Sequence, residues 1–138
     1  MKEKTVLVTG CFDVLHRGHI ELLYIAAEHG KVVVGINDDE SVQKLKGPKR
    51  PVNNEVDRLF LIEALGSVTY GFIIFDVKVD KAIMDIKPDI WMKGGDYTME
   101  TLNKDEVEAA RNVGAEIIII PTCKGYSTTE TLKKLEAE

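Results

Sequence analysis

Two histidines near the beginning of the chain form its most chemically suggestive pattern. His16 and His19 are three residues apart, with Gly18 between them. At the start of a helix this spacing directs both imidazoles to one side, and the glycine lets a ligand approach the backbone. Such a pair suits a phosphate group or a metal ion, but zinc needs more ligands and the sequence offers only His29, so phosphate is favoured. The alternative is structural: one histidine caps the helix and the other packs against it.

A basic segment further along could hold phosphates as well. Lys46 begins the loop 46–51, which contains one glycine, two prolines and Arg50. Lysine-rich runs are usually solvated, so a charged surface is the alternative to a phosphate clamp. Arg58 falls near the exposed side of the helix predicted to follow, where a surface ion pair competes with phosphate binding.

A third candidate lies near the end of the chain. Ser127 and Glu130 have the spacing of a capping box, so Ser127, Thr128 and Thr129 are expected to open a helix. The free amides at the beginning of a helix bind anions. These hydroxyl residues either bind phosphate or simply cap the helix.

Two apolar patterns alternate along the chain and indicate how these residues are positioned. Short β-branched runs predict strands over 5–9, 31–36, 71–75, 89–92 and 115–120. Apolar residues recurring every three or four positions predict helices over 18–29, 38–45, 54–65, 79–86, 104–113 and 127–135. Strands separated by helices form a parallel sheet, so we predict a doubly wound α/β fold with five strands, in one domain over 1–138. Ligands of such sheets bind at the carboxyl ends of the strands.

Composition excludes several classes of protein. The 138 residues include 18 basic and 23 acidic ones, a net charge of −5, which argues against broad binding of nucleic acid or anionic membranes. No apolar run approaches the roughly 20 residues of a membrane helix, and the beginning lacks the features of a secretory signal, so we expect a cytoplasmic protein. Cys11 and Cys123 are too few for a disulfide scaffold and match no zinc spacing, so no protein-built metal site is expected.

The order of these motifs resembles that of a known superfamily. His16-x-Gly18-His19, placed between the first strand and first helix, is similar to the signature of the nucleotidyltransferases that include cytidylyltransferases and sugar-phosphate adenylyltransferases. Gly10-Cys11-Phe12-Asp13 resembles the first loop of that superfamily, and Ser127-Thr128-Thr129 resembles its second signature. The resemblance spans about residues 5–135 and implies a Rossmann-like nucleotidyltransferase fold.

Two stretches narrow the resemblance. Residues 45–53 with Arg58, and Lys93-Gly94-Gly95-Asp96-Tyr97, are similar to the adenylyltransferase domain that makes ADP-heptose from a heptose 1-phosphate. Glycerol-phosphate cytidylyltransferases typically carry Met-Gly-Asp-Asp-Trp in the second place and Arg-Thr-Glu-Gly-Ile before Ser-Thr-Thr. Residues 122–126 are Thr-Cys-Lys-Gly-Tyr and lack that arginine, which favours ATP over CTP.

The resemblance implies an enzyme that transfers AMP from ATP, with Mg²⁺, to a sugar 1-phosphate such as D-glycero-D-manno-heptose 1-phosphate, releasing pyrophosphate. It also implies a homodimer. The implied catalytic residues are His16, His19 and Lys46, and Arg50 and Arg58 are expected to bind the acceptor phosphate. The implied nucleotide-binding residues are Gly10, Cys11, Phe12, Asp13, Gly18, Lys93, Gly94, Asp96, Ser127, Thr128 and Thr129.

Two alternatives stay open. One is a CTP-dependent glycerol-3-phosphate cytidylyltransferase or a related alcohol-phosphate cytidylyltransferase, and the other is a nucleotide-sensing module without catalysis. A P-loop or dinucleotide-dependent enzyme is not favoured, because the first loop has neither Gly-x-Gly-x-x-Gly nor a Gly-Lys-Ser/Thr ending.

Overall fold

The computed structural model describes residues 3–121 and 128–137, without the side chains of 128–131 and 137. Five strands form one parallel sheet in the order β3-β2-β1-β4-β5. The strands are β1 (Thr5–Gly10), β2 (Lys31–Asn37), β3 (Tyr70–Ile74), β4 (Ile90–Gly94) and β5 (Glu116–Ile120). The winding reverses between β1 and β4, which is the switch point where ligands of such sheets bind. The predicted doubly wound, five-stranded fold is confirmed.

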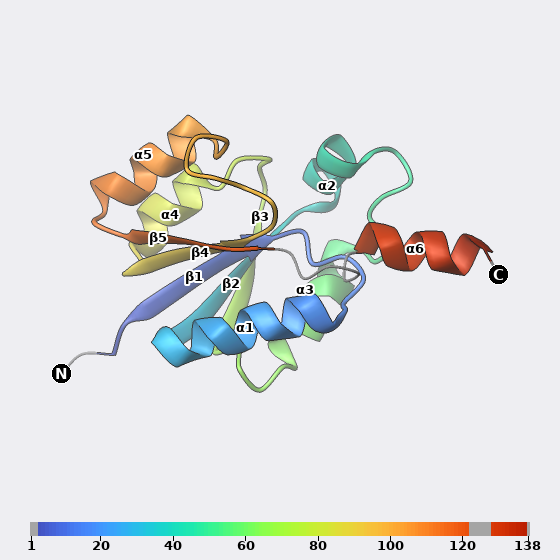
Figure 1. Ribbon diagram of the computed structural model, residues 1–138, viewed down its shortest axis with the longest axis horizontal. Helices are drawn as coiled ribbons and strands as arrows, with labels where there is room; N and C mark the ends of the chain where they lie inside the picture. Colours follow the sequence, from blue (N-terminus) through green and yellow to red (C-terminus); the bar gives the residue numbers. More distant parts are fainter. Residues whose placement is uncertain (1–2, 122–127, 138) are drawn as a thin grey trace.

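Helices cover both faces of this sheet. They are α1 (Arg17–His29), α2 (Asp39–Lys46), α3 (Glu55–Glu63), α4 (Asp80–Ile86), α5 (Lys104–Asn112) and α6 (Thr128–Ala137). Figure 1 shows α1 and α3 on one face and α4 and α5 on the other, with α6 beyond the carboxyl ends of the strands. None of the helices in the described part of the chain is long and apolar enough to cross a membrane.

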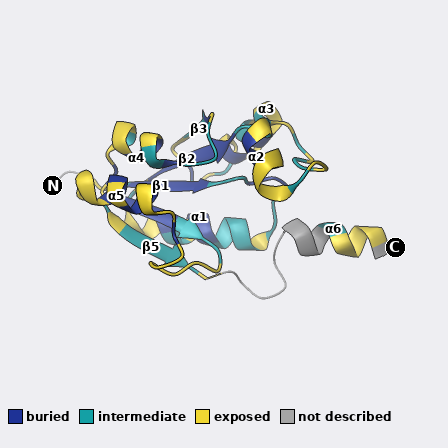
Figure 2. Cartoon of the chain, turned by 90° about the horizontal axis from the view of Figure 1, so that it is seen from above, coloured by how far each residue is buried: buried dark blue, intermediate teal, exposed yellow. Residues whose placement is uncertain are grey.

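The strands bury side chains on both faces, so each face has its own core (Figure 2). Successive side chains of a strand point to opposite faces. On β4, Ile90 and Met92 belong to the cluster packed with α1, whereas Trp91 belongs to the cluster packed with α4 and α5. Trp91 is 0% exposed, and its Nε1 donates to Thr9 Oγ1 at 3.0 Å. By the same alternation, Lys93 lies on the same face of the sheet as Trp91, and Gly94 lies on the same face as Met92.

Most helix and strand ends shift by one or two residues from the sequence prediction, and two of these shifts involve candidate site residues. β4 extends to Gly94, beyond the predicted end at residue 92, so Lys93 and Gly94 are strand residues. The prediction that Lys46 begins a loop is wrong, because Lys46 is the last residue of α2. Gly47 is the C-cap of this helix, and its φ of 107° favours glycine. The lysine is therefore carried by the last turn of a helix.

Candidate active site

A cavity of about 900 Å³ opens at the carboxyl ends of the strands. It brings together most of the predicted site residues, from segments far apart in the sequence. Those lining it are Gly10, Cys11, Phe12, Asp13, His16, Gly18, His19, Lys46, Arg50, Lys93, Gly94 and Asp96. Arg58 does not line it. Ser127 lies outside the described residues, as do the side chains of Thr128 and Thr129.

The histidine pair caps α1 and faces the cavity at the same time. The Gly18 amide donates to His16 Nδ1 at 3.0 Å, and the His16 amide donates to His19 Nδ1 at 3.3 Å. The two rings stack with their centroids 3.9 Å apart. Because each Nδ1 accepts a hydrogen bond, the proton of each neutral ring is on Nε2. Helix capping and phosphate binding are therefore compatible roles for this pair. Capping through Nδ1 fixes the tautomer in which Nε2–H can donate to a ligand.

Burial keeps these imidazoles uncharged. Burial, reinforced by the neighbouring His16, lowers the pKa of His19 to about 4, although Asp13 opposes the shift. Burial also lowers the pKa of His16. At neutral pH the pair is neutral and supplies hydrogen-bond donors, not fixed positive charge.

The loop after β1 shapes the wall beside His19. Phe12 is buried with a φ of 47°, which is uncommon for a side-chain-bearing residue, and its ring centroid lies 5.2 Å from that of His19. A Cβ on Gly10 would lie 3.1 Å from the Phe12 ring, so glycine makes room for it. Burial raises the pKa of the Cys11 thiol despite the positive charge of Lys46, Arg58 and Arg50. Cys11 is thus a neutral thiol, which is not activated as a nucleophile.

Asp13 fastens this loop to the segment after α2. Its carboxylate is 1% exposed and accepts from Arg50 Nε at 2.7 Å and from the amides of Val52 at 2.8 Å and Asn53 at 2.9 Å. Burial alone would raise the pKa of Asp13, but the amides of Asn53 and Val52 and the Arg50 guanidinium hold it below its ordinary value. Asp13 is therefore a charged anchor that places Arg50 at the cavity.

The prediction that Arg58 lies on the exposed side of its helix is wrong, because the residue is 0% exposed. Its Nη1 donates to the backbone oxygens of Cys11 at 2.8 Å and Asn37 at 2.7 Å. Its Nη2 donates to Asp39 Oδ1 at 2.8 Å, and its Nε donates to the Asn53 oxygen at 3.0 Å. The guanidinium ties the ends of β1 and β2 to the beginning of α2, the helix that carries Lys46.

Of the basic residues in 44–50, some line the cavity and others face solvent. Lys46 and Arg50 line the cavity. Lys44 instead forms an exposed ion pair with Glu40 at 3.5 Å, and Lys49 is exposed and away from the cavity. Lys46 and Arg50 therefore line the cavity, whereas Lys44 and Lys49 do not. The sequence alone could not make this distinction.

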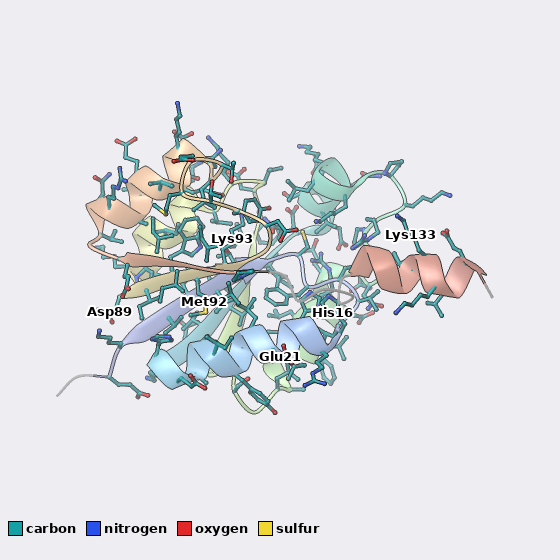
Figure 3. All side chains as sticks on the ribbon, viewed as in Figure 1. His16, Glu21, Asp89, Met92, Lys93 and Lys133 are labelled. Atoms are coloured by element: carbon teal, nitrogen blue, oxygen red, sulfur yellow. The ribbon has the colours of Figure 1, made fainter. Side chains whose placement is uncertain are left out.

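The cavity has two walls of different character, one on each face of the sheet. On the α1 side the lining includes the apolar Leu22, Ile25 and Ile120. A Cβ on Gly94 would lie 2.9 Å from Leu22 Cδ2, so glycine keeps this side open. On the α4 and α5 side the lining includes Lys93 and Glu106. Figure 3 shows Lys93 on the side of the sheet covered by α4 and α5, and His16 at the beginning of α1.

Glu106 is a cavity residue that the sequence analysis missed. It is 4% exposed, its Oε2 accepts from the Val79 amide at 2.9 Å, and its Oε1 lies 3.8 Å from Lys93 Nζ. Lys93 Nζ in turn lies 4.4 Å from the centroid of the Tyr97 ring. The carboxylate therefore joins α5 to the loop before α4 and to the end of β4.

Figure 1 draws α6 beyond the carboxyl ends of the strands, on the side of the molecule where α1 begins. The helix α6 and the histidines that open α1 therefore lie on the same side of the molecule. Within the described residues, no group of three or more His, Cys, Asp and Glu could hold a metal ion.

The sequence is similar to a large set of known proteins. A profile of cytidylyltransferase-like proteins matches residues 7–134. The bifunctional protein HldE of Hyphomonas neptunium is 44% identical over 135 residues, and that of Marinomonas sp. is 42% identical over 135 residues. Each alignment covers 96% of this chain but 27% and 28% of the respective relatives, so the chain spans about a quarter of their length.

Solved structures share the fold. The lipopolysaccharide core biosynthesis protein from Thermoplasma volcanium superposes with a TM-score of 0.72 at 28% identity, over 91% of this chain and 100% of that one. A pantoate-beta-alanine ligase from Francisella tularensis superposes with a TM-score of 0.57 at 16% identity, over 97% of this chain and 69% of that one. The second similarity concerns the fold alone.

Proposed function

Because the chain belongs to the cytidylyltransferase-like family and is a nucleotidyltransferase, we propose that it transfers AMP from ATP to a sugar 1-phosphate. One observation carries this proposal: two neutral histidine donors and two basic side chains, Lys46 and Arg50, line the same cavity of about 900 Å³. That volume falls in the upper part of the roughly 300–1,000 Å³ typical of ligand pockets, which suits two ligands side by side.

In the proposed reaction, a phosphate oxygen of the acceptor attacks the α-phosphorus of ATP. A new P–O bond forms, the bond from the α-phosphorus to the bridging oxygen breaks, and its electrons leave on pyrophosphate. No protein nucleophile is required, which is consistent with the neutral thiol of Cys11. Holding the two ligands in line can contribute about 7–11 kcal/mol to lowering the barrier.

The histidines act as neutral donors to the phosphates. His19 Nε2–H donates to the α-phosphoryl oxygen on which charge develops, and His16 Nε2–H donates to a neighbouring phosphate oxygen. Preorganisation strengthens both contacts, because the backbone amides hold the two rings through Nδ1. Lys46 and Arg50 add positive charge, and the amides that open α6 are suited to the β- and γ-phosphates.

The adenine ring is proposed to lie against the apolar α1 side of the cavity. Leu22, Ile25 and Ile120 line that side, and Gly94 leaves space for a flat ring. Asp96 also lines the cavity and is proposed to contact the ribose.

Magnesium enters this proposal with ATP. Mg²⁺ usually keeps several waters and binds substrate phosphates with one or two carboxylates. Asp13 lines the cavity but is already saturated by Arg50 and two amides, so the ion would be held mainly by the phosphates and by water. It would neutralise charge on the phosphates.

The acceptor we propose is D-glycero-D-manno-heptose 1-phosphate. The resemblance of residues 45–53 and 93–97 to a heptose 1-phosphate adenylyltransferase domain supports it, as do the relatives named HldE.

The test follows pyrophosphate release with ATP or CTP and a panel of phosphorylated acceptors. Turnover with ATP and a sugar 1-phosphate is expected. Turnover restricted to CTP and glycerol 3-phosphate would replace the proposal with the cytidylyltransferase alternative. Tight triphosphate binding without pyrophosphate from any acceptor would indicate a sensing module.

A further inference from the structure

We propose that the hydroxyl groups of the acceptor sugar bind in the part of the cavity covered by α4 and α5, with Glu106 as their hydrogen-bond acceptor. This inference rests on the proposed function and specifies which side chains distinguish a polyhydroxylated acceptor from a simple phosphate. Val79, Lys93 and Glu106 line this part of the cavity.

The Glu106 carboxylate has one oxygen available to a ligand. The residue is 4% exposed, and among the described residues its Oε2 accepts one hydrogen bond, from the Val79 amide. Its Oε1 accepts no hydrogen bond there and lies 3.8 Å from Lys93 Nζ. Because Glu106 lines the cavity, a ligand in the cavity can supply a donor to Oε1, and a hydrogen bond to a charged group is among the stronger ones.

The donor that suits Glu106 is a hydroxyl group. A carboxylate repels phosphate but accepts readily from a hydroxyl, and Lys93 beside it can donate to the oxygen of the same or a neighbouring hydroxyl. Thr101 and Asn103 also line this part of the cavity and add neutral hydrogen-bonding groups. A ligand with several adjacent hydroxyls matches this set, which is what a sugar offers and an alkyl phosphate does not.

The polar and the apolar walls of the cavity lie on opposite faces of the sheet. Strand alternation directs Lys93 to the face of α4 and α5, whereas Gly94 opens to the apolar side with Leu22. A base stacks on apolar walls, so the nucleotide and the sugar are assigned to opposite faces of the sheet. The side chain of Lys93 is therefore assigned to the acceptor, although the family resemblance predicts it as a nucleotide-binding residue.

Glu106→Gln tests the role of the carboxylate with little structural change. The amide oxygen of glutamine can still accept from the Val79 amide, while its NH₂ group cannot accept from a sugar hydroxyl. The matched control is Glu108→Gln, which removes the same charge from an exposed position on the same helix. Lys93→Gln leaves the Glu106–Val79 bond in place and provides the same test should Glu106→Gln fail to fold.

The assay measures pyrophosphate release with ATP and the best sugar 1-phosphate acceptor, together with its monodeoxy analogues. Glu106→Gln is expected to raise KM for the sugar phosphate by about tenfold or more, the usual effect of losing a hydrogen bond to a charged group, and to change KM for ATP less than about twofold. At least one monodeoxy analogue should be nearly insensitive to the substitution, because it lacks the hydroxyl that Glu106 binds. Glu108→Gln should match the wild type.

Three results would overturn the inference. An unchanged KM for the sugar phosphate removes Glu106 from its binding, and an equal rise in KM for ATP places Glu106 at the nucleotide. An equal loss with every deoxy analogue leaves Glu106 a purely structural role. If the wild-type protein releases no pyrophosphate with any sugar phosphate, the proposed function itself fails, and that result is read from the wild type alone.

Discussion

Acidification should destabilise this protein through His19. In the unfolded chain the imidazole binds a proton near its ordinary pKa of 6.5, whereas burial holds the folded pKa at about 4. Between these values the unfolded state binds more protons, so the free energy of unfolding falls as the pH falls. The slope is about 1.4 kcal/mol per pH unit, so from pH 6.5 to pH 5 His19 costs the folded state about 2 kcal/mol.

Urea denaturation at pH 8 and at pH 5 measures this loss. His19→Gln has no titrating ring at this position, so its unfolding free energy should fall by about 2 kcal/mol less than that of the wild type over the same interval. The control, His29→Gln, removes an exposed histidine from the other end of α1 and should lose as much as the wild type. Equal losses in the wild type and His19→Gln would refute the conclusion that partial burial keeps His19 neutral.

Three further substitutions test the assigned roles. His19→Ala should lower kcat by about 10²-fold or more, because it removes a donor to the charge that develops on the phosphoryl oxygen, whereas His29→Ala should not; an unchanged rate would remove His19 from the site. Lys46→Ala should slow pyrophosphate release and Lys49→Ala should not, and equal rates in both variants would mean that Lys46 is a surface charge. Asp13→Asn should lower the unfolding free energy by about 3–5 kcal/mol in urea, because Arg50 loses its buried partner; a loss under about 1 kcal/mol would contradict the anchoring role.

The sequence predicted the sheet, the alternation of its helices and the histidine pair, because these depend on local patterns. Apolar periodicity and glycine positions mark the elements, and a pattern such as His16-x-Gly18-His19 is contiguous. The strand order places these segments at one edge of the sheet. The neutral tautomer of the histidines could not be predicted, because it depends on which backbone amides reach each Nδ1.

The buried polar contacts were missed because their partners are distant in the chain. Arg58 was expected near the exposed side of its helix, but it shares the buried side of α3 with Ile62, four residues on. Glu106 likewise occupies the apolar stripe of Leu102, Ala109 and Ala110, at helical spacing. A charged residue on a core stripe was thus the available signal in both cases. The homodimer and the roles of Ser127, Thr128 and Thr129 stay predictions of the resemblance.

The most direct test of the account is a crystal structure with a non-hydrolysable ATP analogue. We expect the phosphates to lie between the beginnings of α1 and α6, with oxygens within hydrogen-bond distance of Nε2 of His16 and His19 and of the amides that open α6. A triphosphate bound away from both histidines would contradict it.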